Sequence, residues 1–186
     1  MERSLSKFSQ NISRFGDIIE LALFFSKDLD KEQCLLHSSI SLKELKEYLS
    51  KLTTNFKNLP VPQALISIIN KQIRSKKEFD SFRIAIHVIS GEYIAELNFK
   101  YYKGVKIPTD ILTFPYYTSE LWGEIFISIC PSFKKAVARG EKELVYLMRL
   151  FVHGILHLFL GAHSVRFDKL EDLLLEQLGK QMQNQY

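Results

Sequence analysis

The spacing of apolar residues changes several times along the chain, and each spacing predicts a different kind of element. Apolar side chains recur three and four apart over residues 42–52, where Ser41 and Glu44 form a capping-box pattern, and this predicts an amphipathic helix. Residues 82–89 alternate apolar with other side chains and predict a strand buried on one face. Residues 17–25 are apolar on all sides, which we interpret as a further short helix near the N-terminus.

The remaining patterns predict an alternation of helices and strands. Helices are predicted over residues 63–73, 91–102, 133–138, 141–160 and 169–182, and strands over residues 110–114 and 124–129. The 141–160 segment carries a wide apolar stripe that is typical of a central helix, and Gly161 supplies its C-terminal stop.

Turn residues gather at positions 55–62, which include two prolines, and separate the leading segment from the rest of the chain. We therefore predict an N-terminal helical extension over residues 1–58 and a main domain over residues 59–186. The 186 residues, 46% of them apolar, suit one compact unit with an appendage and exclude a disordered chain or a coiled-coil rod.

The sequence favours a cytoplasmic protein without a membrane span. Its longest nearly apolar stretch, residues 150–160, is shorter than the roughly 20 residues that a bilayer crossing needs and contains two histidines. The first residues are polar where a secretory signal needs an apolar core. Cys34 and Cys130 match no paired-thiol metal spacing, so we predict free thiols in a reducing compartment.

The chain carries 25 basic and 21 acidic residues, a formal net charge of +4. The basic residues cluster in the C-terminal two-thirds, around positions 71–77, 100–106 and 134–142. Such clusters suit a polyanion such as RNA. Charge alone is equally consistent with an ordinary solvated surface.

Three histidines within eleven residues give the sharpest chemical signal. His153 and His157 are four apart on a predicted helix, so both imidazoles can aim at one point, and the chain that reverses at Gly161 can return His163 to the same place. Such a pair alone is more often structural, but the third histidine favours a metal. Three imidazoles on one Zn²⁺ leave a coordination position for water, as catalytic zinc sites do.

The histidine spacing is close to the zinc peptidase pattern H-E-x-x-H-x-x-G-x-x-H, in which the glutamate is the general base. Gly154 occupies the position of that glutamate. A peptidase mechanism therefore lacks its proton acceptor.

The segments HGILHLFLGAH (153–163), IPTDILTFP (107–115) and GEIFIS (123–128) together resemble the YbeY family, the bacterial rRNA maturation endoribonucleases. The resemblance covers about residues 59–182, and it is the joint match of three motifs in order that makes it specific. It implies an α/β (α+β) fold, with a small mixed β-sheet flanked by helices and a zincin-like central helix that carries the metal histidines.

The resemblance further implies a hydrolase: a zinc-dependent endonuclease with one Zn²⁺ per chain on His153, His157 and His163. Its substrate would be single-stranded regions of ribosomal RNA, cleaved in rRNA maturation and ribosome quality control, with the small subunit or its associated proteins as partners. Residues 1–58 are longer and more helical than the short leading strand usual in the family.

Two residues depart from the family pattern. Ala162 stands where the family has an aspartate, which removes a candidate support for the metal ligands. Lys103 replaces the family's arginine and keeps its charge but not its bidentate contact with phosphate.

For the reaction we assign Lys103 to neutralise charge that develops on the phosphate, and Asp110 to orient a metal ligand or, in the alternative, to cap a turn. Lys100, Lys106 and Lys135 would contact RNA phosphates, and at least one tyrosine of each adjacent pair, 101–102 and 116–117, should be exposed for stacking. Two other functions remain open: a ribosome-associated RNA-binding factor with a mainly structural zinc site, and a zinc hydrolase of a peptide or small ester.

Overall fold

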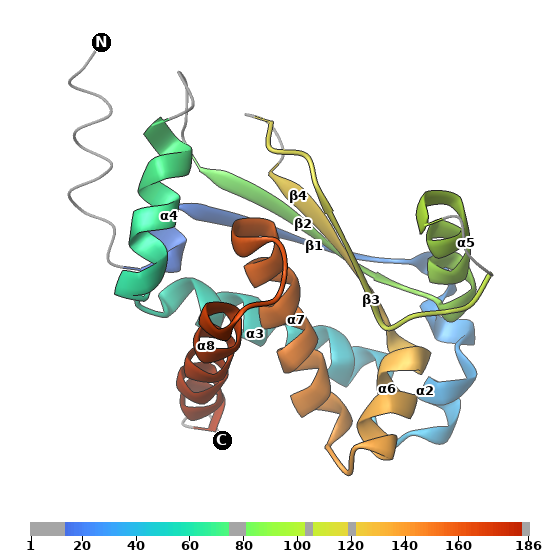
Figure 1. Cartoon of the computed structure of the whole chain (residues 1–186). Helices are drawn as coiled ribbons and strands as arrows, with labels where there is room; N and C mark the ends of the chain where they lie inside the picture. Colours follow the sequence, from blue (N-terminus) through green and yellow to red (C-terminus); the bar gives the residue numbers. More distant parts are fainter. Residues whose placement is uncertain (1–13, 75–80, 103–105, 119–121, 184–186) are drawn as a thin grey trace.

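The computed structural model of the chain describes residues 14–74, 81–102, 106–118 and 122–183 (Figure 1). Four strands form one sheet in the order β1-β2-β4-β3: β1 (Ile19–Phe25), β2 (Phe82–Ile89), β4 (Gly123–Ser128) and β3 (Ile111–Pro115). Strands β1, β2 and β4 are parallel, and β3 is antiparallel to β4, so the sheet is mixed and β3 is one of its edges. The predicted fold class is confirmed.

Strand β1 lies where the apolar run over residues 17–25 predicts a helix, so that prediction is wrong. Leu21 and Leu23 pack against the main core, whereas Ala22 and Phe24 face the other side, where Phe24 is 50% exposed. A strand with apolar residues on both faces has the composition of a buried helix. The parallel pairing with β2, which no local pattern reveals, decides between the two.

The helices predicted from residue 41 onward are confirmed. The described helices are α2 (Gln33–His37), α3 (Leu42–Asn58), α4 (Gln63–Arg74), α5 (Gly91–Tyr102), α6 (Ile129–Ala138), α7 (Glu143–Leu160) and α8 (Val165–Gln183), with 3-10 turns at Phe15–Asp17 and Lys27–Lys31. Ser41 caps α3 as its sequence predicts, because its hydroxyl accepts from the Glu44 N–H while the Glu44 carboxylate accepts from the Ser41 N–H.

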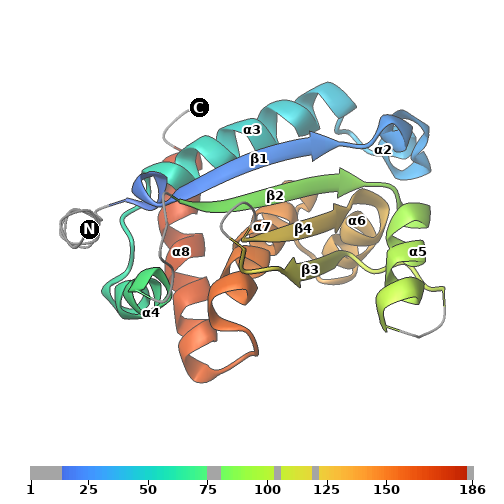
Figure 2. The same cartoon turned by 90° about the horizontal axis from the view of Figure 1, so that it is seen from above.

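The helices cover the two faces of the sheet unequally. Helices α3, α7 and α8 lie below the sheet in Figure 1, and the main hydrophobic core fills the space between them and the strands. Helix α5 covers one end of the opposite face over a small second core of Ile89, Ile94, Leu112 and Phe126 (Figure 2).

Helix α7 is the central element of the larger core. By length and apolar composition alone it could cross a bilayer, but 61% of it is buried inside the fold, as in the core helix of a folded domain. A Cβ atom at Gly154 would lie 2.8 Å from Ile125 Cγ2, nearer than side chains tolerate, and 3.1 Å from Ile111 Cδ1, where the isoleucine would have to shift slightly. The glycine therefore lets α7 pack directly against β4 and β3, and it brings the neighbouring His153 and His157 beneath the edge strand.

Cys34 and Cys130 are joined by a disulfide, so the prediction of free thiols is wrong for this structure. Helix α2 packs against α6 and brings the two Cα atoms to 5.4 Å, a separation that suits a disulfide. The cysteines are 96 residues apart, and this tertiary contact is invisible in their spacing.

The division at residue 58 stays a prediction. The described part of the leading segment contributes β1 to the common sheet, and Leu45, Leu52 and Phe56 of α3 to the main core. It is therefore joined to the rest of the fold through both secondary structure and packing.

Candidate metal centre

The three histidines of the C-terminal motif meet at one point. His153 and His157 lie one turn apart on α7, and Gly161, with φ 73°, reverses the chain and returns His163 toward them. Ligand nitrogens of all three lie within 4.8 Å of one another, and the ring centroids are 4.5 to 5.0 Å apart. The predicted convergence of the imidazoles is therefore present.

Two of the rings face each other through nitrogens that both carry a lone pair. Nδ1 of His153 lies 2.7 Å from Glu171 Oε1, and Nδ1 of His157 lies 2.5 Å from the Gly161 carbonyl oxygen. Both partners only accept hydrogen bonds when Glu171 is ionised, so each Nδ1 carries the proton of the neutral ring. The two Nε2 atoms, 3.0 Å apart, are then both acceptors, and a shared cation satisfies them where a hydrogen bond between neutral rings does not.

The spacing of these nitrogens fits a metal ion. Two nitrogens that are each about 2.1 Å from one tetrahedral ion lie about 3.4 Å apart. Burial lowers the pKa of His157, the hydrogen bond to Gly161 opposes this, and the neighbouring imidazoles lower the pKa further. The net shift is downward, which favours the neutral, metal-binding form.

Helix α8 places two carboxylates beside the rings, and one of them, Glu171, is within hydrogen-bond distance. Burial alone would raise the pKa of Glu171, but the hydrogen bond with His153 and the charge of Arg149 outweigh it, so the pKa is lowered and Glu171 is ionised. Asp168 Oδ1 lies 3.8 Å from His163 Nδ1. Carboxylates that hold the second nitrogen of a ligating imidazole are typical of metal sites. Support that Ala162 cannot give is thus supplied by the next helix.

The sequence interpretation missed Glu171. Its only local signal is a turn of acidic residues, Asp168, Glu171 and Asp172, at the start of a predicted amphipathic helix. Its role depends on α8 folding back across α7, where buried Phe167 packs against all three imidazoles with ring centroids 4.6 to 5.3 Å away.

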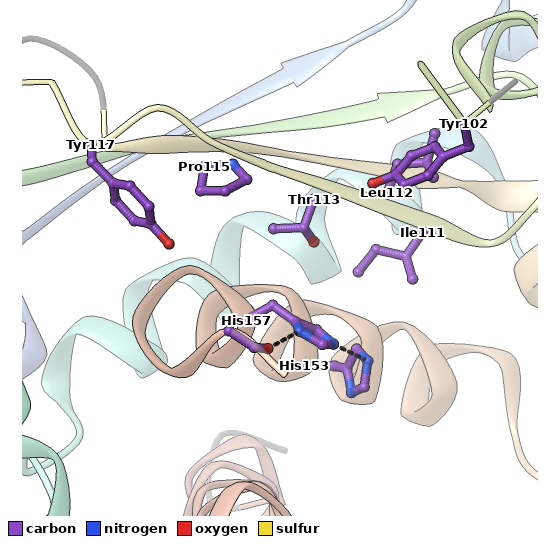
Figure 3. Close-up of a pocket in the computed structure, with 9 residues that line it drawn as sticks. Tyr102, Ile111, Leu112, Thr113, Pro115, Tyr117, His153 and His157 are labelled. Carbon is purple, nitrogen blue, oxygen red and sulfur yellow. Dashed lines mark hydrogen bonds between the residues drawn. The ribbon is translucent and has the colours of Figure 1, made fainter. Parts of the chain in front are cut away.

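A cleft of about 330 Å³ opens between α7 and the edge strand β3 (Figure 3). His153 and His157 form its floor, Ile111 and Thr113 face them from β3, and Tyr102 and Tyr117 stand at opposite ends. The prediction of exposed tyrosines is confirmed, since all four tyrosines at 101, 102, 116 and 117 are 42 to 57% exposed. Tyr117 has φ 57°, an uncommon backbone conformation for a residue other than glycine.

Asp110 lies just before β3 and is buried, with Oδ1 2.7 Å from Lys135 Nζ and Oδ2 2.8 Å from the Tyr146 hydroxyl. Its burial would raise its pKa, but the hydrogen bonds from Lys135 and Tyr146 outweigh this and hold the pKa below its ordinary value. Burial and the bond to Asp110 raise the pKa of Tyr146 to about 12. Thr109 supplies a further bond, and no described partner of Asp110 is one of the three histidines.

The predicted lysines are not gathered at one place. Lys103 lies outside the described residues. Lys135 is engaged with Asp110, Lys106 forms an exposed pair with Glu96 at 3.0 Å, and Lys100 lies 5.1 Å from the ring centre of Tyr101. None of these three lies among the described residues that line the cleft.

A mixed sheet over a central helix, with three converging histidines of which two line a cleft, defines an α+β protein with a candidate metal centre. A sequence model described as "Endoribonuclease YbeY" matches residues 44–178. The chain belongs to the YbeY family.

Curated relatives named Endoribonuclease YbeY agree with this assignment. The protein from Sulfurihydrogenibium sp. (strain YO3AOP1) is 30% identical over 130 residues, which cover 63% of this chain and 84% of the relative. Those from Thermotoga sp. (strain RQ2) and Thermotoga maritima are 38% identical over 88 residues, covering 45% of this chain. The matches span 55% of both Thermotoga proteins, little more than half their length.

The fold has a solved counterpart. The solution structure of TM1509 from Thermotoga maritima superposes with a TM-score of 0.54 over 90% of this chain and 93% of that protein, at 21% sequence identity. This likeness supports the fold class described above.

Proposed function

We propose that this protein is a metal-dependent endoribonuclease that cleaves single-stranded ribosomal RNA in the cytoplasm during rRNA maturation and ribosome quality control. The observation that carries the proposal is the pair of facing Nε2 lone pairs of His153 and His157, with His163 beside them, at the floor of a cleft. The name of the curated relatives, Endoribonuclease YbeY, supports RNA as the substrate class.

Zinc is the proposed metal because three neutral imidazoles suit it and leave one coordination position open. Bound there, the ion would supply Lewis acidity and lower the pKa of a coordinated water toward neutrality. His153, His157 and His163 would hold it, while Glu171 and the Gly161 carbonyl keep two of the rings aimed. Phe167 keeps water away from the side of the rings that it covers.

The rest of the cleft would position the RNA. Tyr102 and Tyr117 stand at its two ends, where exposed rings can stack on unpaired bases on either side of the scissile phosphate. Lys100 lies on α5, the helix that also carries Tyr102, and Lys106 follows this helix in sequence. Both would contact phosphates, while Lys103 would neutralise charge on the phosphate under attack. Asp110 would act as a positioning residue, because its oxygens bind Lys135 and Tyr146 and so fix the start of β3.

A ribosome-associated RNA-binding factor with a mainly structural zinc is the second candidate. It is favoured by the absence of any carboxylate among the described residues that line the cleft, and by Ala162 in place of an acid. A zinc hydrolase of peptides is disfavoured because Gly154, at the position of the peptidase base, packs against β4.

The test is cleavage of end-labelled single-stranded and duplex RNA by the purified wild type, by the metal-stripped protein and by His157→Ala. We expect cleavage of the single strand by the wild type, its loss in both other samples, and its return when zinc is added to the stripped wild type. Cleavage that survives both treatments would refute metal dependence. Metal-dependent RNA binding without cleavage would favour the second candidate.

A further inference from the structure

A second cluster of metal-ligating side chains lies away from the histidine cleft, where α2 meets α6 (Figure 1). We propose that Glu32, Cys34 and Cys130 form a second metal site, which takes zinc when the cysteines are reduced and is closed by their disulfide when they are oxidised. The proposal is independent of the ribonuclease activity.

The fold brings the three donors together from separate elements. Glu32 immediately precedes α2, Cys34 lies in its first turn, and Cys130 is the second residue of α6. A carboxylate oxygen and the two sulfur atoms lie within 4.8 Å of one another, close enough to bind one ion. All three residues are only partly buried, so an ion or a reductant can reach them from solvent.

Two of the three donors, Cys130 and Glu32, lie in surroundings that favour binding a cation. Cys130 lies in the first turn of the ten-residue helix α6, where backbone N–H groups and the helix dipole favour a thiolate. The Gly91 N–H donates to Glu32 Oε1 at 3.1 Å and orients the carboxylate. Within the described part of the chain, no hydrogen bond or ion pair occupies the other oxygen, Oε2.

The two states of the cysteines exclude each other chemically. A dithiol reductant transfers two electrons and two protons to the Cys34–Cys130 bond, which breaks to give two thiols while the reductant becomes a disulfide. Zinc binding then displaces the two thiol protons and leaves two thiolates and one carboxylate on the ion. Water would complete a tetrahedral coordination, since the protein supplies three ligands.

The proposed cytoplasmic location makes the reduced state the relevant one, because disulfides are rare in that compartment. Two reduced thiols held this close beside a carboxylate offer three ligands to a single cation. Thiolates select zinc or copper(I) over magnesium, calcium and manganese. Among these metals, the hard oxygen donor of Glu32 favours zinc over copper(I).

The test is zinc content after incubation with excess zinc and gel filtration, on the full chain, with the disulfide either reduced or intact. We expect two zinc ions per reduced wild-type chain and one per oxidised chain. Reduced Cys34→Ser/Cys130→Ser should hold one, and reduced His157→Ala should hold one at the cysteine site. Circular dichroism confirms that each variant is folded.

Cobalt(II) identifies the ligands directly, since thiolate coordination produces a sulfur-to-cobalt charge-transfer band that imidazole coordination does not. The band should appear in the reduced wild type and in His157→Ala, and be absent from the double serine variant. Equal zinc content in reduced wild type and double serine variant, together with no such band, would overturn the proposal. Because His157→Ala reports on the cysteine site alone, that failure is distinguishable from failure of the histidine centre.

Discussion

Two polar clusters lie between the edge strand β3 and the helices packed near it. They differ in how the hydrogen-bonding capacity of their polar atoms is satisfied. At the start of β3, Asp110 is buried and its oxygens receive hydrogen bonds from Lys135 and Tyr146. In the cleft, the Nε2 atoms of His153 and His157 direct two lone pairs at each other, and no described residue donates a hydrogen bond to them. The first cluster is satisfied by described residues of the chain, whereas the second could be completed by a cation. The comparison separates a structural network from a candidate functional centre.

The largest expected effect is that of removing a ligand of the histidine cluster. We expect His157→Ala to lose RNA cleavage by more than about 100-fold, because an incomplete ligand set neither retains nor orients the metal. His87→Ala is the matched control, since His87 lies on β2 against Phe24 and Phe126, outside the residues that line the cleft. Equal losses in both variants would contradict a special role for the cluster.

The second largest effect is expected from Glu171, the carboxylate that accepts a hydrogen bond from His153. Glu171→Gln retains the shape of the side chain but weakens its hold on the His153 Nδ1–H, and we expect zinc affinity to fall by about 10 to 100-fold. Glu176→Gln is the control on the same helix, because Glu176 is exposed and its ion-pair partner among the described residues is Lys180. Competition with a chromophoric chelator measures both affinities. An unchanged affinity in Glu171→Gln would remove this residue from the site.

Asp110→Asn tests whether the cluster at the start of β3 contributes to stability rather than to RNA cleavage. Loss of the buried charge should cost about 2 kcal/mol of unfolding free energy, less than a fully buried pair because the Lys135 side chain is 53% exposed. Glu96→Gln, which breaks an exposed pair with Lys106, should cost less than about 1 kcal/mol. Urea unfolding measures both. A stable Asp110→Asn variant that has lost cleavage would instead support the catalytic role predicted from sequence.

Two helical glycines, Gly154 and Gly179, differ in how closely other residues pack against them, and replacing each by alanine should change the stability of the fold in opposite directions. Gly154→Ala should destabilise the fold by about 1 to 3 kcal/mol, because its methyl group meets Ile125 and Ile111. Gly179→Ala, in α8 with nothing within 4 Å, should stabilise it by about 0.5 to 1 kcal/mol. Thermal unfolding should show shifts of opposite sign. Shifts of the same sign would contradict the close approach of α7 to the sheet.

The smallest expected effect is the pH dependence of the free energy of unfolding that Asp110 contributes. The folded-state pKa of Asp110 is lowered, so its stabilising contribution is present above its unfolded pKa of about 3.9 and is lost as the pH falls through the folded value. The difference in unfolding free energy between wild type and Asp110→Asn should therefore be constant near neutrality and shrink below about pH 4. A difference that persists undiminished at pH 2 would contradict the lowered pKa.

The sequence patterns correctly predicted the features of the fold that depend on interactions between residues close in sequence. The capping box at Ser41, the alternation in β2 and the i, i+4 pair on α7 are complete within a few residues, and the structure reproduces them. The joint resemblance of three motifs supplied the fold class and the family. His163 was predictable because Gly161 marks the reversal of the chain.

Features that depend on tertiary pairing were missed. The β1 segment was assigned to the wrong element, since its outward Ala22 and Phe24 conceal the alternation that pairing with β2 exposes. The cysteine pair and the Glu171–His153 contact join residues 96 and 18 positions apart. The Lys135–Asp110 ion pair joins residues 25 positions apart and was not predicted either, while the expected contact of Lys135 with RNA stays a prediction.

The central claim is that His153, His157 and His163 together bind one metal ion. Calorimetric titration of zinc into chelator-stripped Cys34→Ser/Cys130→Ser tests it most directly, because this variant keeps the histidine cluster as its only described three-ligand group. We expect a stoichiometry of one zinc per chain, and no binding once His153, His157 and His163 are also replaced by alanine. Absence of zinc binding in the folded serine variant, or binding that survives loss of all three imidazoles, would contradict it.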